Sequence, residues 1–233
     1  MKLYLDQLKY YYLTMPSSIE RQNNINKNFK AYDLNKINPA TKDISKFQSG
    51  SSGFSRMIYA GLKNQKRDMP FQPFVLLEDD ATKYREFPEY IEIPDDTDIL
   101  YIGTSIWASD NEMNDACHNI LTSSVKEYSD IARIYNILSM HGLIITSMLG
   151  ALACQKAMSD AFYKNIAWDI PFAYIQPYYN VYALIEPLVY QDGSVRGCEE
   201  ATKNSLNLNL LDKPFPPNVF NTTNYSIITS TII

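Results

Sequence analysis

The stretch Phe74-Val75-Leu76-Leu77-Glu78-Asp79-Asp80 joins four apolar residues directly to three carboxylates. Such an apolar run predicts a strand that is buried on both faces of a sheet. The acids follow where the strand leaves the sheet, and open α/β sheets bind ligands at the carboxyl ends of their strands. Because side chains alternate along a strand, Glu78 and Asp80 should point one way and Asp79 the other. Such a pair can hold a divalent metal, which can in turn hold a diphosphate; the alternative is a solvated acidic turn.

The bulk composition excludes several classes of protein. The chain has 233 residues, of which 45% are hydrophobic and 20% charged, enough for one large domain with a full core. A net charge of -5 argues against general nucleic-acid binding. Apolar runs long enough to span a membrane are absent, and the early acid Asp6 is atypical of a signal peptide, so a cytoplasmic protein is expected. Two histidines and three distant cysteines argue against a zinc site.

Strand-like and helix-like segments alternate along the chain, which predicts one α/β domain with a central mixed, mostly parallel sheet flanked by helices. Strands are predicted at 9–13, 74–77, 98–103, 142–145, 172–176 and 181–189. Helices are predicted after the capping-box pair Ser17 and Glu20, just after the Gly50-Ser51-Ser52-Gly53 turn, at 124–138 and at 151–162.

The composition changes near the end of the chain. Residues 1–203 are expected to form the α/β domain. From 204 to 233 Asn, Pro, Thr and Ser dominate, with Pro214, Pro216 and Pro217 close together. This segment is expected to be either a tail or a linker to further domains C-terminal to this chain.

Several segments taken together resemble the GT-A glycosyltransferases, most closely family 25, the lipopolysaccharide-type sugar transferases. The similar segments are 11–14 with Arg21, 53–55, 76–81, 98–103, 142–158, 168–169 and 187–191. The sequence departs from the family at Ser55, which is followed by Arg56 where family members usually carry a histidine. The small size and the Asn- and Tyr-rich composition are also similar to the small GT-A domains of large algal DNA viruses, which act on capsid glycans; such a protein would work in the host cytoplasm.

The resemblance implies metal-dependent transfer of a sugar from a nucleotide diphosphate sugar, with UDP as the expected nucleotide, to a glycan or glycoprotein acceptor. It assigns metal binding to Asp80 together with Glu78, and contact with the metal or the ribose to Glu78 or Asp79. Mn²⁺ or Mg²⁺ suits a site built only from oxygen ligands.

The resemblance also implies where the donor and the acceptor bind. It places the base pocket after the first strand, at Leu13-Thr14-Met15. Arg21 and Arg56 can assist the phosphates, since guanidinium pairs well with phosphate oxygens, although both also suit a solvated helix face. If transfer inverts the sugar configuration, Asp169 is the candidate base that takes the acceptor proton; otherwise it is an acid that caps a loop.

Weaker candidates and other functions remain open. His141 either lines an acceptor site or is structural, and Gln191 either reaches an acceptor or closes the fold. The chain can instead be a non-catalytic carbohydrate-binding or assembly module, which the intact acidic motif argues against. A metal-dependent phosphoesterase or nuclease would need more acids at neighbouring strand ends, whereas Asp95, Asp96 and Asp98 precede their strand.

Overall fold

Eight strands form one mixed sheet. The computed structural model describes residues 1–104, 121–125, 127–135 and 137–196, and the predicted tail at 204–233 lies outside them. The strand order is β3 (Asp33–Ile37), β2 (Lys9–Leu13), β4 (Phe74–Glu78), β10 (Gly142–Ile145), β7 (Ile99–Gly103), β11 (Val181–Leu184), β9 (Tyr128–Tyr135) and β8 (Leu121–Val125). Two small antiparallel ribbons flank it, β1 (Lys2–Tyr4) with β6 (Tyr90–Glu92) and β12 (Val189–Gln191) with β5 (Ala81–Lys83).

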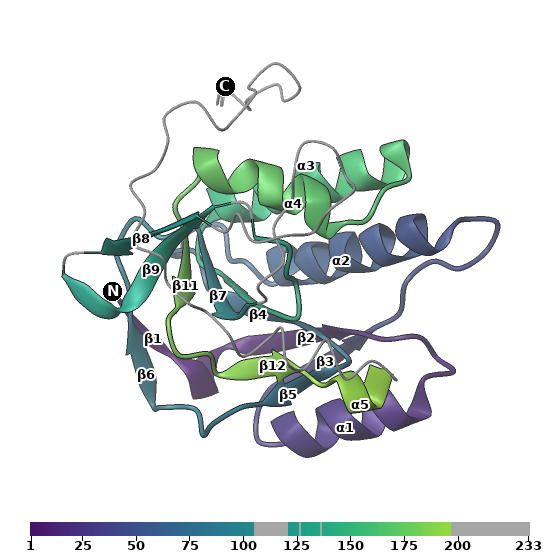
Figure 1. Cartoon of the computed structure of the whole chain (residues 1–233), viewed down its shortest axis with the longest axis horizontal. Helices are drawn as coiled ribbons and strands as arrows, with labels where there is room; N and C mark the ends of the chain where they lie inside the picture. Colours follow the sequence, from purple (N-terminus) through teal and green to yellow (C-terminus); the bar gives the residue numbers. More distant parts are fainter. Residues whose placement is uncertain (105–120, 126, 136, 197–233) are drawn as a thin grey trace.

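Helices cover both faces of the sheet (Figure 1). On one face lie α2 (Lys46–Lys63), α3 (Met148–Lys164) and α4 (Asp169–Ile175), which continues into the 3-10 turn η2 (Gln176–Tyr178). On the other lie α1 (Ile19–Phe29) and the short α5 (Gly193–Arg196), while the 3-10 turn η1 (Leu5–Gln7) joins β1 to β2. The chain is therefore an α/β domain with a central mixed sheet packed between helices, as predicted.

The central strands send alternate side chains into two cores, one on each face. In β4, Leu76 packs beneath α2, whereas Val75 and Leu77 pack toward α1. The core beneath α2, here the α2 core, includes Tyr11, Phe54, Met57, Ile58, Leu76, Tyr101, Leu143 and Phe172. The opposite α1 core includes Tyr10, Tyr12, Ile25, Phe29, Val75, Leu77, Leu100, Ile102 and Ile144. Burial of β4 on both faces, predicted from its apolar run, is confirmed.

The register brings several strand ends to one edge of the sheet. The parallel pair β2 and β4 aligns Leu13 with Glu78. The antiparallel strand β10 places Gly142 opposite both Leu77 of β4 and Gly103 of β7. The ends of β2, β4 and β7 and the start of β10 therefore meet at what we call the carboxyl edge.

The sheet is less parallel than predicted. Among the seven pairings in the main sheet, β3–β2, β2–β4 and β7–β11 are parallel and the other four are antiparallel. The prediction that most of the pairings are parallel was wrong, because β10 inserts between β4 and β7 in the opposite direction. A hairpin at the far side of the sheet adds two further antiparallel pairings.

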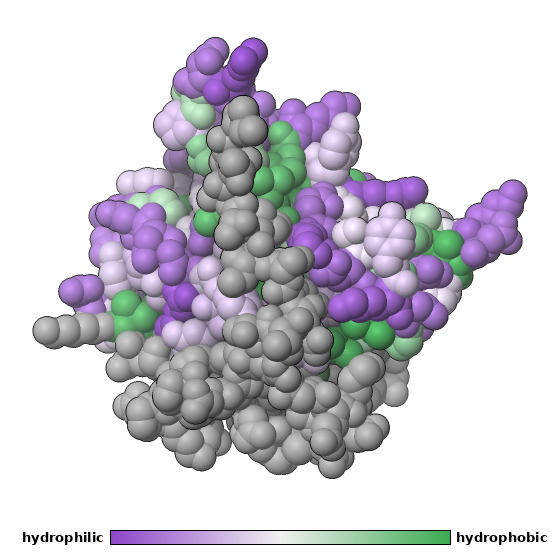
Figure 2. All heavy atoms as spheres, turned by 90° about the horizontal axis from the view of Figure 1, so that it is seen from above, coloured by the Kyte–Doolittle hydropathy of each residue, from purple (hydrophilic) through white to green (hydrophobic). Residues whose placement is uncertain are grey.

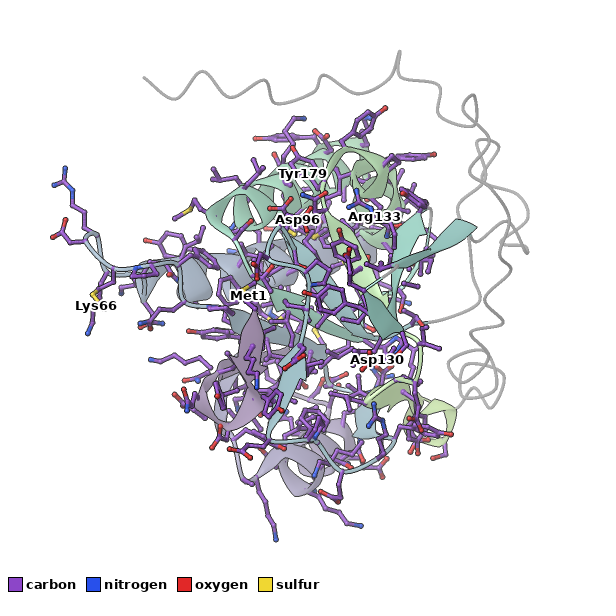
Figure 3. All side chains as sticks on the ribbon, turned by 90° about the vertical axis from the view of Figure 1, so that its left-hand side faces the viewer. Met1, Lys66, Asp96, Asp130, Arg133 and Tyr179 are labelled. Carbon is purple, nitrogen blue, oxygen red and sulfur yellow. The ribbon has the colours of Figure 1, made fainter. Side chains whose placement is uncertain are left out.

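That hairpin replaces the helix predicted at 124–138. Residues 121–125 and 128–135 form the antiparallel strands β8 and β9. The spacing of Val125, Tyr128, Ala132 and Tyr135 fits a helix, but β-branched and aromatic residues also favour a pleated surface. The strand conformation is stabilised because β9 pairs with β11. Arg133 of β9 adds to this pairing by donating to Asn180 Oδ1 at 2.7 Å and to the Tyr179 carbonyl (Figure 3).

Two other local predictions also need correction. The predicted strand at 172–176 is mostly helix α4, because Pro171 falls in the first helical turn, where proline is tolerated. Helix α2 begins at Lys46 rather than after Gly53, since Ser45 and Gln48 form a complete capping box. The predicted helix after Ser17 is present as α1, but its cap position is Ser18, which makes no side-chain cap bond.

The outer surface of the helices is mainly polar, but three exposed apolar side chains, Met148, Leu149 and Leu152, lie close together on α3. Seen from above, apolar areas show between the hydrophilic ones, and the hydrophilic turn after α2 projects from the molecule (Figure 2). Lys66 lies on this projection (Figure 3). Within the described ranges, no helix has both the length and the apolar character needed to cross a bilayer.

Gly150 is expected to resist substitution although it lies in a helix. Alanine is favoured over glycine in helices by about 1 kcal/mol. A Cβ at Gly150 would, however, lie only 2.3 Å from the carbonyl oxygen of Asp98. We expect Gly150→Ala to lower the free energy of unfolding by about 1–3 kcal/mol, measured by urea denaturation. The control Leu149→Ala, at a side chain that is 45% exposed, should change it by about 0.5 kcal/mol or less. Unchanged stability of Gly150→Ala would contradict this packing.

Candidate functional site

Three consecutive acids lie where β4 ends and the following turn begins. Glu78 is the last residue of the strand, Asp79 and Asp80 form the turn, and β5 begins at Ala81. Asp79 and Asp80 are buried and Glu78 is half-buried. Buried carboxylates require partners, because their charge is costly to remove from water.

Glu78 and Asp80 face the same partner, as the alternation of side chains predicts. The Gln191 amide nitrogen Nε2 donates to Glu78 Oε2 at 3.4 Å and to Asp80 Oδ2 at 3.2 Å. Asp79 turns to a different partner, Arg21. The two like-charged carboxylates are thus brought to one point with a polar donor between them, which offsets part of their repulsion.

The ribbon β12–β5 positions Gln191. Gln191 is aligned with Ala81 in the antiparallel pairing, and the backbone N–H of Asp192 donates to the carbonyl of Asp80 at 2.9 Å. Beneath the ribbon, Val189 packs on two glycines. A Cβ at Gly103 would lie 2.5 Å from the Val189 carbonyl oxygen, and one at Gly142 would lie 2.4 Å from Val189 Cγ2. The ribbon therefore lies directly on β7 and β10.

Arg21 reaches the third acid from α1. Its Nη1 donates to Asp79 Oδ1 at 3.1 Å, and the side chains are 32% and 8% exposed respectively. A guanidinium has five N–H donors, so this contact leaves others for an anion at the surface. The arginine both compensates the buried acid and brings positive charge to the carboxyl edge.

The predicted base pocket adjoins the acids. Leu13 is aligned with Glu78 across the β2–β4 pairing. Buried Thr14 donates its backbone N–H to the Ile37 carbonyl at 3.1 Å, whereas Met15 is 39% exposed. Residues 13–15 thus leave β2 beside the carboxylate pair and present an apolar side chain to solvent.

Arg56 lies further along the same side of the molecule. Its Nη1 donates to the Asn38 carbonyl at 3.0 Å, just after β3. Because β3 pairs with β2 on the side away from β4, Arg56 is near the end of the neighbouring strand rather than beside the acids. It lies off the buried face of α2, as expected.

Asp169 approaches from the helices above the α2 core. It is the first residue of α4, not part of an irregular loop, and the preceding Trp168 packs on Phe54 of α2 with ring centroids 6.1 Å apart. Burial raises the pKa of Tyr101 well above 10, and the nearby charge of Asp169 acts in the same direction. Asp169 therefore lies near the β7 side of this core, and its role as a base stays a prediction.

His141 is a buried neighbour of Glu78. Its carbonyl accepts the Glu78 backbone N–H at 3.3 Å, and its Nδ1 lies 3.0 Å from Ser139 Oγ. Within the part of the chain that the structure describes, its Nε2 is buried without a hydrogen bond. Burial lowers the pKa of His141 to about 4, so the imidazole is neutral at pH 7.

The two carboxylates suit a hard divalent cation whose remaining ligands come from water or from a bound phosphate group. Among the described residues, no three His, Cys, Asp or Glu side chains converge as a complete metal site. Glu78 and Asp80 supply two carboxylates. Mg²⁺ is usually held by one or two carboxylates and completed by water and substrate phosphates, so this pair fits such an ion.

No protein-family model matches the sequence, and no curated protein matches it significantly.

The sequence pointed to Gln191 only as a residue that reaches an acceptor or closes the fold, and its contact with the acids was not predicted. Gln191 is 111 residues from Asp80, and the pairing of β12 with β5 is what joins them. A run of three residues such as β12 carries no local signal for its strand partner. The contact therefore appears only once the chain is folded.

Removal of the Arg21 guanidinium should destabilise the fold. Arg21→Met leaves the buried Asp79 carboxylate without its ion pair, so the free energy of unfolding should fall by about 1–3 kcal/mol in urea denaturation. Arg21→Lys should lose less because it keeps the charge. The control Arg67→Met removes an exposed arginine and should change stability by about 0.5 kcal/mol or less. Equal effects of the two methionine variants would rule out a stabilising ion pair.

His141 should make stability depend on pH. Its folded pKa of about 4 lies below the usual 6.5, so the unfolded chain binds the proton more readily. The free energy of unfolding is therefore highest above pH 6.5 and falls as the pH is lowered toward 4. The shift in the pKa of His141 corresponds to about 3 kcal/mol of this free energy. In urea denaturation with EDTA present, the free energy of unfolding of His141→Asn should fall less between pH 6.5 and 4 than that of wild type. The asparagine keeps a polar partner for Ser139. Parallel pH profiles for wild type and variant would contradict this.

Proposed function

We propose that this chain is a metal-dependent glycosyltransferase of the GT-A type, which moves a sugar from a UDP-sugar to a glycan or glycoprotein acceptor. The observation that carries the proposal is the convergence of Glu78 and Asp80 on one point at the carboxyl edge. The resemblance of the segments around this edge to family 25 supports it. A cytoplasmic location, further C-terminal domains and a viral origin belong to the same proposal.

The acids, through a bound metal ion, and Arg21 would together offset the negative charge of a departing diphosphate. A bound Mn²⁺ or Mg²⁺ would neutralise charge on the diphosphate. Glu78 and Asp80 would hold that ion, and Asp79 keeps Arg21 beside it through the 3.1 Å ion pair. The remaining guanidinium donors of Arg21 can bind phosphate oxygens as charge-assisted hydrogen bonds.

The nucleoside and the acceptor would occupy neighbouring parts of the edge. Residues 13–15 leave β2 beside Glu78, so the exposed Met15 side chain can pack on the base. Arg56 lies at the end of the adjacent strand, where it can assist the nucleotide. Asp169, at the start of α4, would take the proton of the acceptor hydroxyl if the reaction inverts the sugar configuration.

One observation favours a second function, a non-catalytic carbohydrate-binding or assembly module on the same fold. Gln191 donates to one oxygen of each carboxylate, so the pair is held together without a cation. A module of this kind would need no metal-dependent affinity for nucleotides. Nucleotide binding therefore separates the two proposals.

Binding of UDP should require a divalent metal and Asp80. In calorimetric titrations we expect wild type to bind UDP with Mn²⁺ present and to lose binding on addition of EDTA. Asp80→Asn removes a ligand charge and should weaken binding at least about tenfold, or roughly 1.4 kcal/mol. The control Asp68→Asn changes an exposed acid on the turn after α2 and should bind like wild type. Absence of metal-dependent binding in wild type would overturn the transferase proposal and favour the second function.

A further inference from the structure

The orientation of the Gln191 amide follows from its two acceptors. Ionised carboxylates only accept hydrogen bonds, so the amide group that faces them must be the donor. The reverse orientation would place the amide oxygen against Glu78 Oε2 and Asp80 Oδ2, three acceptors with no proton between them. With both carboxylates ionised, the amide nitrogen, 3.4 Å from one carboxylate oxygen and 3.2 Å from the other, is therefore the group that faces them.

This amide nitrogen and a cation compete for the same place. A Mg²⁺ ion lies about 2.0–2.1 Å from each oxygen ligand. Glu78 and Asp80 would hold such an ion through carboxylate oxygens, and the N–H groups of Gln191 now point to one oxygen of each carboxylate. Binding of the ion to both carboxylates therefore requires the amide to turn.

The smallest adequate movement is rotation of the terminal amide. That torsion is broad and roughly two-fold, so a half turn exchanges Nε2 with Oε1 at little cost. The backbone of Gln191 stays in place, because β12 pairs with β5 and Asp192 is bonded to the Asp80 carbonyl. After the half turn a carbonyl oxygen faces the ion, and glutamine carbonyls are suitable ligands for hard cations.

We propose that Gln191 has two alternating roles at this site. Without metal its N–H donors hold the two carboxylates together, and with metal its carbonyl oxygen becomes the third protein ligand. Gln191 is thus a positioning residue for Glu78 and Asp80 and a determinant of metal affinity. This inference depends on the proposed function, because that function supplies the divalent ion.

Two substitutions at Gln191 test both roles without an activity assay. Mn²⁺ affinity is measured from the electron paramagnetic resonance signal of free Mn²⁺, with and without saturating UDP. Gln191→Leu removes donor and acceptor and should weaken Mn²⁺ binding about tenfold or more. Gln191→Glu keeps an oxygen ligand, so it should bind Mn²⁺ at least as tightly as wild type. In EDTA both variants should unfold at lower urea concentrations than wild type.

Gln65→Leu is the matched control, since the Gln65 amide bonds the carbonyls of Gly61 and Gln72 on the turn after α2, away from the acids and from the residues proposed to bind the nucleotide. It should leave Mn²⁺ affinity unchanged. If Gln191→Leu fails to fold, Gln191→Asn replaces it, because its shorter side chain should also weaken Mn²⁺ binding.

The outcomes separate this inference from the function on which it depends. If wild type binds Mn²⁺ and Gln191→Leu, or Gln191→Asn in its place, binds it equally or more tightly, the amide only competes with the ion and the inference is overturned. The transferase proposal would survive that result. If wild type binds no Mn²⁺ even with UDP, both are overturned.

Discussion

The burial of β4 on both faces is the constraint on which the rest of the structure depends. A strand covered on two sides must be apolar throughout, so its first charged residue has to fall where the covering ends. Phe74 to Leu77 are buried, and Glu78 emerges at the carboxyl edge. A shift of one residue in register would exchange the two faces of the strand and draw Glu78 toward the core. The hydrophobic pattern therefore fixes the position of the acids.

Two side chains from different parts of the fold compensate the three acids. Arg21 comes from α1 and Gln191 from β12, while the backbone of β10 begins beside Glu78. These elements are distant in sequence and meet only at this edge. The site consequently forms only after the sheet, the helix beneath it and the covering ribbon have all assembled. This explains why so much charge is tolerated in a half-buried position.

The sequence predicted the parts of the fold that follow from local burial. The strands at 9–13 and 142–145 were predicted to the residue, and alternation correctly placed Glu78 and Asp80 on one partner and Asp79 on another. Segments 124–138 and 172–176 were misassigned because short apolar patterns fit helix and strand alike, and their long-range neighbours decide between them. The contacts of Gln191 and His141 were not predicted for the same reason. The roles of Asp80, Arg56 and Asp169 in catalysis remain predictions.

The close contact of Val189 with Gly103 and Gly142 has a consequence for how this site can fail. The ribbon that carries Gln191 rests on two positions of the sheet that lack side chains. A methyl group at Gly103 would meet the backbone of the ribbon itself, so it would push the ribbon outward and carry the amide away from the carboxylates. The acids, the arginine and the amide would all still be present, but no longer within reach of one another. The candidate site can therefore be taken apart while every side chain that forms it is kept.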